Sequence, residues 1–275
     1  MAGSRRSPWL RLAAPLALAV AAGTLTGLAV SAAIHMPRVD GLAEYTPPTI
    51  TRLLDRDGRV FASYASERRV MVAEDEIPEV LRQAVLAAED ANFFGHGGVD
   101  AQGVVRAAVS NALQGTRQGG STLTMQLARK LYLTPEKTWR RKIEEALLSV
   151  EIEKNFSKQQ IFTLYCNLMY LGHGNYGVAA AAGAYFGKGV GDLTLAEAAT
   201  LAGILQRPSA YSPYRRPDLV LQRRDYVLRR MREEGYIGSD QVDGALRTPL
   251  VVLPEQAEIE QAPYFAEEVR RYLAE

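Results

Sequence analysis

The sequence is poor in cysteine and histidine, with one cysteine and three histidines among 275 residues. A single cysteine, Cys166, cannot form a disulfide within the chain, which excludes a disulfide-stabilised framework. So few thiol and imidazole groups also argue against a zinc site. The net formal charge is only +1, so no overall field attracts nucleic acid, and no nucleic-acid partner is expected. The 47% hydrophobic content suffices for the core of one domain with an appendage.

One long uncharged run stands near the N-terminus, from Leu12 to Ile34. As a helix, its 23 residues would extend about 35 Å, enough to cross a hydrocarbon core of about 30 Å. Arginines precede the run and none follows before Arg38, so the positive-inside rule predicts a cytoplasmic tail at residues 1–11 and an external domain. A cleaved signal peptide is the alternative. The run is longer than a usual signal core, which favours an uncleaved single-pass anchor in the cytoplasmic membrane.

The rest of the chain has the pattern of a mainly α domain. A proline-bearing linker is expected at 35–49, a core at 50–215, and a C-terminal helical part with the start of a further linker at 216–275. The turn signal at Asp55–Gly58, among β-forming residues, predicts a small hairpin or three-stranded sheet. Helix starts are expected at Pro78, Thr134-Pro135, Ser157 and Thr194, a helix end at Gly172, and a break near Gly235.

Glu89 stands at the end of an apolar helical pattern, just before Phe93, Phe94 and a glycine-rich turn. A carboxylate at such a helix end, beside aromatic rings, is partly desolvated, and desolvation raises its pKa toward the range of a general base. An acid is also poorly placed at the negative end of a helix dipole, so a function would explain its presence. The alternative is a helix-terminal acid with no chemical task.

A glycine-led polar segment, Gly119 to Thr122, precedes a second helix. Thr122, Gln126 and Arg129 share one face of that helix by their spacing. Free N–H groups together with a hydroxyl, an amide and a cation would form a cradle for pyrophosphate or sugar. The spacing of a Walker loop is absent. An ordinary Ser/Thr N-cap is the alternative interpretation.

A third segment brings two cations and an acid together, because Arg141 and Lys142 lie four and three residues before Glu145. Such a group is most often a salt-bridged surface helix, and each pair then contributes only tenths of a kcal/mol, about 0.3. The functional interpretation makes Glu145 a second carboxylate that orients cations near a phosphate leaving group.

Taken in order, these three segments resemble the peptidoglycan glycosyltransferases of glycosyltransferase family 51, found in class A penicillin-binding proteins and monofunctional transglycosylases. The motifs are Glu89-Asp90-x-x-Phe93-x-x-His96, Gly119 to Gln126, Arg141-Lys142-x-x-Glu145, and the later stretches 165–172, 176–182 and 184–188. The resemblance implies a mainly α, lysozyme-like fold. Residues 99–116 match the mobile part of a hydrophobic subdomain that dips into the bilayer.

The resemblance also implies roles. Glu89 would be the general base on the 4-hydroxyl of lipid II, the donor a growing glycan on polyprenyl pyrophosphate, and the anomeric centre would invert. Glu145 would be the second catalytic carboxylate. No cofactor is expected; the family allows a divalent cation, Mg²⁺ or Mn²⁺, near Glu145, but no ligand set in the sequence demands one. Substrate-binding residues would be Asp90, Phe93, His96, Gly120, Ser121, Thr122, Gln126, Arg129, Arg141, Lys142, Asn167 and Tyr170.

The sequence departs from the family pattern at Met125, Arg129-Lys130, Leu168 and Gln206-Arg207-Pro208. Residues 262–273 resemble the segment that leads into a transpeptidase domain. The Ser-x-x-Lys, Ser-x-Asn and Lys-Thr-Gly motifs of that domain do not occur in the chain, so acyl transfer to penicillin is not expected of it. The chain is therefore either a truncated bifunctional protein or a single-activity form.

Two other functions fit parts of the pattern. A muramidase or lytic transglycosylase would use Glu89 as an acid and cleave glycan, as hydrolases with paired carboxylates do. Such an enzyme has no need of an anchor or of cations grouped for pyrophosphate. A non-catalytic membrane scaffold would keep the fold and bind other cell-wall synthesis proteins. The expected partners of the transferase are lipid II, the growing glycan strand, the membrane and such proteins.

Overall fold

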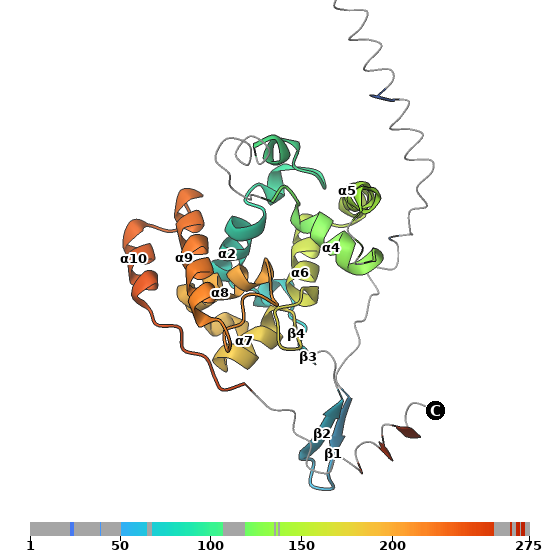
Figure 1. Cartoon of the computed structure of the whole chain (residues 1–275), viewed down its shortest axis with the longest axis vertical. Helices are drawn as coiled ribbons and strands as arrows, with labels where there is room; N and C mark the ends of the chain where they lie inside the picture. Colours follow the sequence, from blue (N-terminus) through green and yellow to red (C-terminus); the bar gives the residue numbers. More distant parts are fainter. Residues whose placement is uncertain are drawn as a thin grey trace, which may run out of the picture. The chain divides into compact units, whose positions relative to one another are not determined.

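The structure is a computed structural model of the whole chain (Figure 1). It describes residues 23–24, 39, 51–64, 68–106, 119–134, 136, 138–255, 265, 268–269 and 271–272. The chain divides into two units, residues 1–38 and 39–275, and the second contains every element discussed below.

The predicted membrane anchor at 12–34 lies outside the described residues except for Gly23 and Thr24, which are helical. The predicted cytoplasmic tail and linker also fall outside them, apart from Val39. None of the helices formed by the described residues has the length and apolar character needed to cross a membrane. The anchor therefore stays a prediction.

The described domain is mainly α, as predicted. Its helices are α2 (Glu79–Glu89), α4 (Leu123–Tyr132), α5 (Trp139–Asn155), α6 (Lys158–Leu168), α7 (Val178–Phe186), α8 (Leu195–Leu205), α9 (Pro217–Glu233) and α10 (Ser239–Arg247), with 3-10 turns η2 (Glu74–Glu76), η3 (Phe93–Gly95) and η4 (Val190–Asp192). Its strands are β1 (Thr51–Leu54), β2 (Val60–Tyr64), β3 (Arg68–Arg69) and β4 (Asn175–Tyr176).

The predicted β element near the start of the domain is a two-stranded hairpin. β1 and β2 pair antiparallel, with a register shift between Leu53 and Leu54. β3 does not extend this hairpin; it pairs in parallel with β4, with Arg68 opposite Asn175. The three-stranded alternative is therefore wrong, because the third strand finds its partner about a hundred residues further along.

Helix α8 forms the centre of the core. Nearly all of its residues are apolar and buried, as expected of a helix covered on every side. It packs against α2 and α9, while α4 packs against α5 and α6 (Figure 1). The approach of α8 to α9 depends on Gly203, where a Cβ atom would stand 3.0 Å from Cγ of Arg223. The two helix groups carry the candidate site.

Helix caps explain which predicted boundaries are right. Ser157 and Thr194 each begin a capping box, which confirms both predicted helix starts. The start predicted at Thr134-Pro135 is wrong, since α5 begins at Trp139, where the Thr138 side chain accepts a hydrogen bond from the Arg141 N–H at 3.1 Å. Threonines four residues apart compete for one cap, and the sequence pattern does not separate them.

Two further boundaries differ from prediction. Pro78 is the N-cap of α2 instead of its first helical residue. Helix α6 ends at Leu168, before Gly172, which has φ +93° in the following turn. A Cβ atom at position 172 would stand 3.0 Å from the Tyr185 hydroxyl. Gly172 is thus needed for a tight turn, not for the helix end. The break at Gly235 is confirmed, because α9 ends at Glu233 and Gly235 has φ +77°.

Candidate active site

Glu89, predicted as the general base, and Gln126, predicted to bind substrate, are in direct contact. Glu89 is the last residue of α2, and Gln126 Nε2 donates to its Oε2 at 2.8 Å. The side-chain oxygen of Gln126, Oε1, accepts a hydrogen bond from the Tyr165 hydroxyl at 3.2 Å. Among the described residues, Glu89 Oε1 is buried and has no hydrogen-bond partner. One carboxylate oxygen is therefore held in place and the other is left with its lone pairs unused.

The surroundings of Glu89 suit its carboxylate to the role of a general base. Burial raises the pKa of its carboxyl above the usual value, and the charge of Asp90 adds to the rise. The hydrogen bond from Gln126 and the positive charges of Arg223 and Arg129 oppose that rise. A carboxylate whose pKa lies closer to neutrality is a stronger proton acceptor when ionised.

Asp90 and His96 belong to a group of hydrogen-bonded residues that joins the end of α2 to the start of α4. His96 Nε2 lies 3.1 Å from both oxygens of the buried Asp90 carboxylate. Oδ2 of Asp90 also accepts the backbone N–H of Leu123 at 3.0 Å. Thr122, the N-cap of α4, donates its hydroxyl to the Gly98 carbonyl at 2.6 Å and accepts from the helix. These contacts position Glu89 beside the helix that carries Gln126.

Glu145 is the centre of a cationic cluster. Its side chain is 0% exposed and lies 2.8 Å from Lys142 Nζ, 3.2 Å from Arg141 Nε and 3.7 Å from Arg129 Nη1. Lys142 Nζ also donates to the Ser121 hydroxyl at 2.6 Å. Three cations around one carboxylate leave a local excess of positive charge. All five residues were predicted from the sequence, and two separate segments bring them together.

Asn167 holds a backbone segment. Its amide accepts the Val72 N–H and donates to the Val72 carbonyl, both at 2.9 Å. Its oxygen and one N–H are thereby engaged, and its substrate-binding role stays an untested prediction. Tyr170 packs against Tyr176, whose ring also lies 4.6 Å from Lys130 Nζ. Among the described residues, the side-chain contacts of Asn167 and Tyr170 are with Val72 and Tyr176.

Phe93 is a core residue. Its ring is fully buried and contacts the rings of Phe94 and Phe162, with Lys158 Nζ 4.3 Å above it. Gly120 lies where a Cβ atom would come 3.3 Å from a methyl group of Val104. For both, the structure gives a packing reason for the residue type, and substrate contact stays a prediction.

Arg223 was missed as a site residue. It begins a basic run from Arg223 to Arg232, and such runs are usually solvated helix faces. In the structure its charge acts on the Glu89 carboxylate from α9, and its buried Nε has no hydrogen-bond partner among the described residues. The signal that could have found it is Gly203, whose missing side chain makes room for the Arg223 stem.

The departures from the family pattern fall in different environments. Met125 and Leu168 are buried in the core. Arg129 keeps a cation beside Glu145. The side chain of Gln206 accepts a hydrogen bond from the Tyr211 hydroxyl at 3.3 Å. Two of these substitutions are thus matters of packing, and one preserves the charge.

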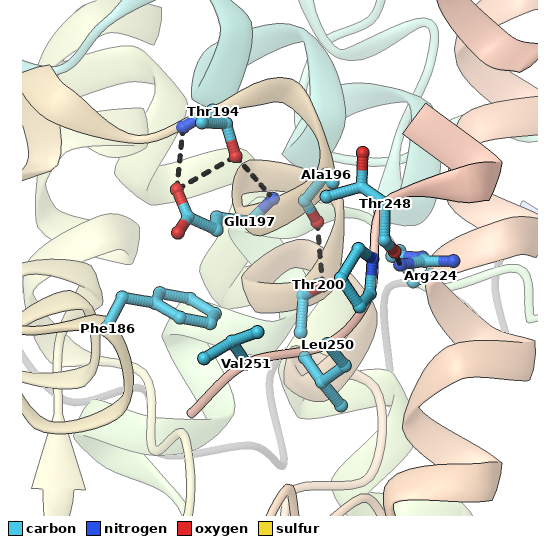
Figure 2. Close-up of a pocket in the computed structure, with 10 residues that line it drawn as sticks. Phe186, Thr194, Ala196, Glu197, Thr200, Arg224, Thr248, Leu250 and Val251 are labelled. Atoms are coloured by element: carbon cyan, nitrogen blue, oxygen red, sulfur yellow. Dashed lines mark hydrogen bonds between the residues drawn. The ribbon is translucent and has the colours of Figure 1, made fainter. Parts of the chain in front are cut away.

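A pocket of about 180 Å³ lies at the joint between α8 and the segment that follows α10 (Figure 2). Arg224 closes one side of it by donating to the Thr248 carbonyl at 2.6 Å. None of the predicted site residues lines this pocket. Its lining residues are Phe186, Thr194, Ala196, Glu197, Thr200, Arg224, Thr248, Pro249, Leu250 and Val251.

Comparisons with known proteins agree on one family. Residues 57–232 match the family described as "Transglycosylase". The chain is 45% identical over 240 residues to penicillin-binding protein 1A of Aquifex aeolicus, covering 87% of this chain and 33% of that protein. It is 46% identical over 242 residues to penicillin-binding protein 1A of Neisseria gonorrhoeae, covering 87% and 30%. The chain thus spans about a third of the length of these relatives.

A solved structure is also similar. The 2.6 Å crystal structure of penicillin-binding protein 1A from Haemophilus influenzae superposes with a TM-score of 0.50 at 26% sequence identity. The match covers 83% of this chain and 24% of that one. The similarity therefore extends over most of the chain described above.

Proposed function

Because the chain belongs to the transglycosylase family, which confirms the resemblance of its motifs, we propose that it is a peptidoglycan glycosyltransferase. The proposed reaction joins lipid II to a growing glycan carried on polyprenyl pyrophosphate. The anomeric carbon inverts, and polyprenyl pyrophosphate leaves. The observation that carries this proposal is the occurrence together of a partly buried Glu89 carboxylate, whose pKa is raised, and three cations around Glu145.

In the proposed mechanism Glu89 is the general base. Its Oε1, which has no hydrogen-bond partner among the described residues, takes the proton from the acceptor 4-hydroxyl. As that oxygen forms its bond to the anomeric carbon, the bond from this carbon to the phosphate oxygen breaks. Gln126 keeps Oε2 in place during the transfer. Orientation and proton removal together account for a large part of the barrier that such enzymes lower.

The cations of the Glu145 cluster are assigned to the leaving group. Negative charge builds on the pyrophosphate as the bond breaks, and preorganised cations stabilise it without reorganisation. Arg129, Arg141 and Lys142 are held by Glu145, so their positions are set before substrate binds. Glu145 then acts on the reaction through these cations, and Ser121 joins them through Lys142.

A divalent cation does not fit the Glu145 carboxylate well. Both of its oxygens already face positively charged side chains, and Mg²⁺ or Mn²⁺ would compete with all three. Among the described residues, no group of three or more His, Cys, Asp or Glu side chains is arranged to hold a metal ion. No step of the proposed mechanism uses a metal.

We propose that the domain lies at the outer surface of the cytoplasmic membrane. A lipid-linked donor requires the domain to work at a membrane surface, and the uncharged run at 12–34 would supply the anchor. The proposed arrangement is a single pass with the N-terminus in the cytoplasm and the domain on the external face. Lipid II, the glycan strand and other cell-wall synthesis proteins are the proposed partners.

Incubation of the purified chain with labelled lipid II tests the function against its two alternatives. A ladder of glycan polymers is the expected product. Shortening of pre-made glycan without polymer would indicate a muramidase or lytic transglycosylase. Neither product, with lipid II still bound, would indicate a scaffold. The Glu89→Gln variant serves as the matched inactive control.

A further inference from the structure

Three side chains from three helices form a hydrogen-bonded relay that ends at Glu89. Tyr165 of α6 donates its hydroxyl to Gln126 Oε1 at 3.2 Å, and Gln126 of α4 donates Nε2 to Glu89 Oε2 at 2.8 Å. Tyr165 is 0% exposed and lies in the core. Only its hydroxyl reaches the polar site.

We propose that Tyr165 is a positioning residue for the proposed base: its hydroxyl fixes the orientation of the Gln126 amide, so that Gln126 presents its N–H, and not its carbonyl, to Glu89. The inference rests on the proposed function, in which Glu89 must be ionised to act. It assigns to a buried aromatic residue a control over the protonation of that base.

The argument begins with the two faces of an amide. The oxygen and nitrogen of a glutamine side chain have nearly the same shape, so rotation by half a turn exchanges a donor for an acceptor. Facing Glu89 with its N–H, Gln126 stabilises the ionised carboxylate. Facing it with its carbonyl, Gln126 would stabilise the protonated carboxyl, which could donate to it. The orientation of one amide thus selects the protonation state of Glu89.

Tyr165 biases that choice. Burial raises the pKa of its hydroxyl well above the usual value, so the group stays protonated and serves as a donor. In the observed orientation it donates to Gln126 Oε1. In the rotated orientation the amide nitrogen would donate to the hydroxyl oxygen, and the hydroxyl proton would have no acceptor on Gln126. A buried donor without an acceptor is unfavourable, so Tyr165 disfavours the orientation that would protonate Glu89.

The remaining charges around Glu89 are independent of this relay. Asp90 follows it at the end of α2, Arg129 approaches from α4 and Arg223 from α9. A Tyr165→Phe substitution changes none of these charges and removes only the hydroxyl. A change in the titration of Glu89 in this variant therefore reports on the relay.

The first test is the pH dependence of kcat/KM for glycan polymerisation. On the acidic side of the profile, the acid limb, the rate falls as Glu89 takes up a proton. In Tyr165→Phe this limb should move to higher pH by about one unit, so the rate at a fixed acidic pH should be about tenfold lower. The rate should approach that of the wild type at high pH, where Glu89 is ionised in both. Tyr185→Phe is the matched control, because Tyr185 is equally buried and donates its hydroxyl to the Leu171 carbonyl at 2.7 Å. Its acid limb should stay in place.

Two outcomes separate the inference from the proposed function. If wild-type protein forms no polymer, the proposed function is ruled out. If the protein is active but the acid limb of Tyr165→Phe does not move, the role of Tyr165 is ruled out. In a Gln126→Met background, Tyr165→Phe should move the limb no further. A second shift of the same size there would show that Tyr165 does not act through Gln126.

A spectroscopic test needs neither activity nor the variant. In wild-type protein with isotope-labelled glutamine, the Gln126 amide should keep its N–H toward Glu89 on both sides of the Glu89 titration. Reorientation of the amide when Glu89 takes up a proton would overturn the proposal, even if Tyr165→Phe did not fold.

Discussion

The carboxylate of Asp90 accepts a hydrogen bond from the backbone N–H of Leu123 at 3.0 Å, across 33 positions of the chain. Leu123 is the first residue of α4, whose N–H has no partner within its own helix. Asp90 follows Glu89 at the end of α2. One side chain therefore joins the C-terminus of one helix to the N-terminus of another, and this joint brings Glu89 within reach of Gln126.

Removal of this joint should destabilise the domain. In Asp90→Ala the Leu123 N–H and the buried His96 imidazole both lose a charged acceptor. Hydrogen bonds to a charged group contribute about 1.5–3 kcal/mol, so we expect the free energy of unfolding to fall by about 2–3 kcal/mol in urea titrations. Turnover should fall as well, because the end of α2 is no longer held against α4 and Glu89 loses its alignment with Gln126.

The matched control for that change is Asp192→Ala. Asp192 is exposed, and a surface change of this kind should alter the free energy of unfolding by less than about 0.5 kcal/mol. Equal loss of stability in both variants would mean that the Asp90 contacts are not the source of the effect.

A second prediction concerns the charge of the Glu145 cluster. In Glu145→Ala, Arg129, Arg141 and Lys142 lose their shared counter-ion. Because the Arg129 and Lys142 side chains are 42% and 38% exposed, solvent screens much of their repulsion, and we expect the free energy of unfolding to fall by about 1 kcal/mol. Added inorganic pyrophosphate should bind the exposed cations and raise the melting temperature of this variant more than that of the wild type. Differential scanning fluorimetry with a pyrophosphate series measures both. If pyrophosphate stabilises neither protein, the cluster is not an anion site.

Much of the site was predictable because the motifs are local. The spacing in Arg141-Lys142-x-x-Glu145 places three side chains on one helix face, and the structure shows the contacts that this spacing predicts. The helix ending at Glu89 was predictable for the same reason. Capping boxes at Ser157 and Thr194 likewise involve residues only three apart.

The contacts that were not predicted join distant parts of the chain. Tyr165 reaches Gln126 across 39 positions, and Asn167 pairs with Val72 across 95. Arg223 acts on Glu89 from a helix more than a hundred residues away. No periodicity specifies such pairs, and the position of Arg223 depends on how α8 and α9 pack at Gly203. The family resemblance gave Asn167 a substrate-binding role but not its Val72 partner, and it gave Arg223 no role.

The burial of Cys166 leads to a third prediction. Burial raises the pKa of the Cys166 thiol to about 12, and the thiolate is the reactive form. At pH 8 native protein should react with iodoacetamide about three orders of magnitude more slowly than a free cysteine with its pKa of about 8.5. The reaction should proceed at the ordinary rate in denaturant. Rapid labelling of native protein would show that the core around α6 opens.

The sign of the same shift sets a pH dependence of stability. A thiol whose pKa is raised in the folded state keeps its proton when the unfolded chain has lost it. Its contribution to stability is therefore complete below the ordinary thiol pKa, and is lost as pH rises from there toward about 12. Urea titrations at alkaline pH should show a steeper loss of stability in the wild type than in Cys166→Ala.

The fourth prediction is that Glu89→Gln stops turnover and stabilises the fold. The substitution removes the proton acceptor, and general-base catalysis typically contributes about 10²–10⁴-fold, so polymerisation should fall by at least that factor. Lipid II binding should be largely unchanged, because the base is needed for the chemical step only. Turnover close to that of the wild type would remove Glu89 from the mechanism.

The stability effect follows from the raised pKa of Glu89. The buried carboxyl favours its protonated form, so its contribution to stability is complete below the ordinary carboxyl pKa and is lost as pH rises through the raised value. At pH 7.5 the wild type carries an unfavourable buried charge that Glu89→Gln lacks. The variant should therefore melt at a higher temperature at pH 7.5, with the difference vanishing near pH 4. Glu79→Gln, at the exposed start of the same helix, should show neither the gain nor the loss of turnover. In the proposed mechanism, the burial that lowers stability at neutral pH is also what makes Glu89 a stronger proton acceptor.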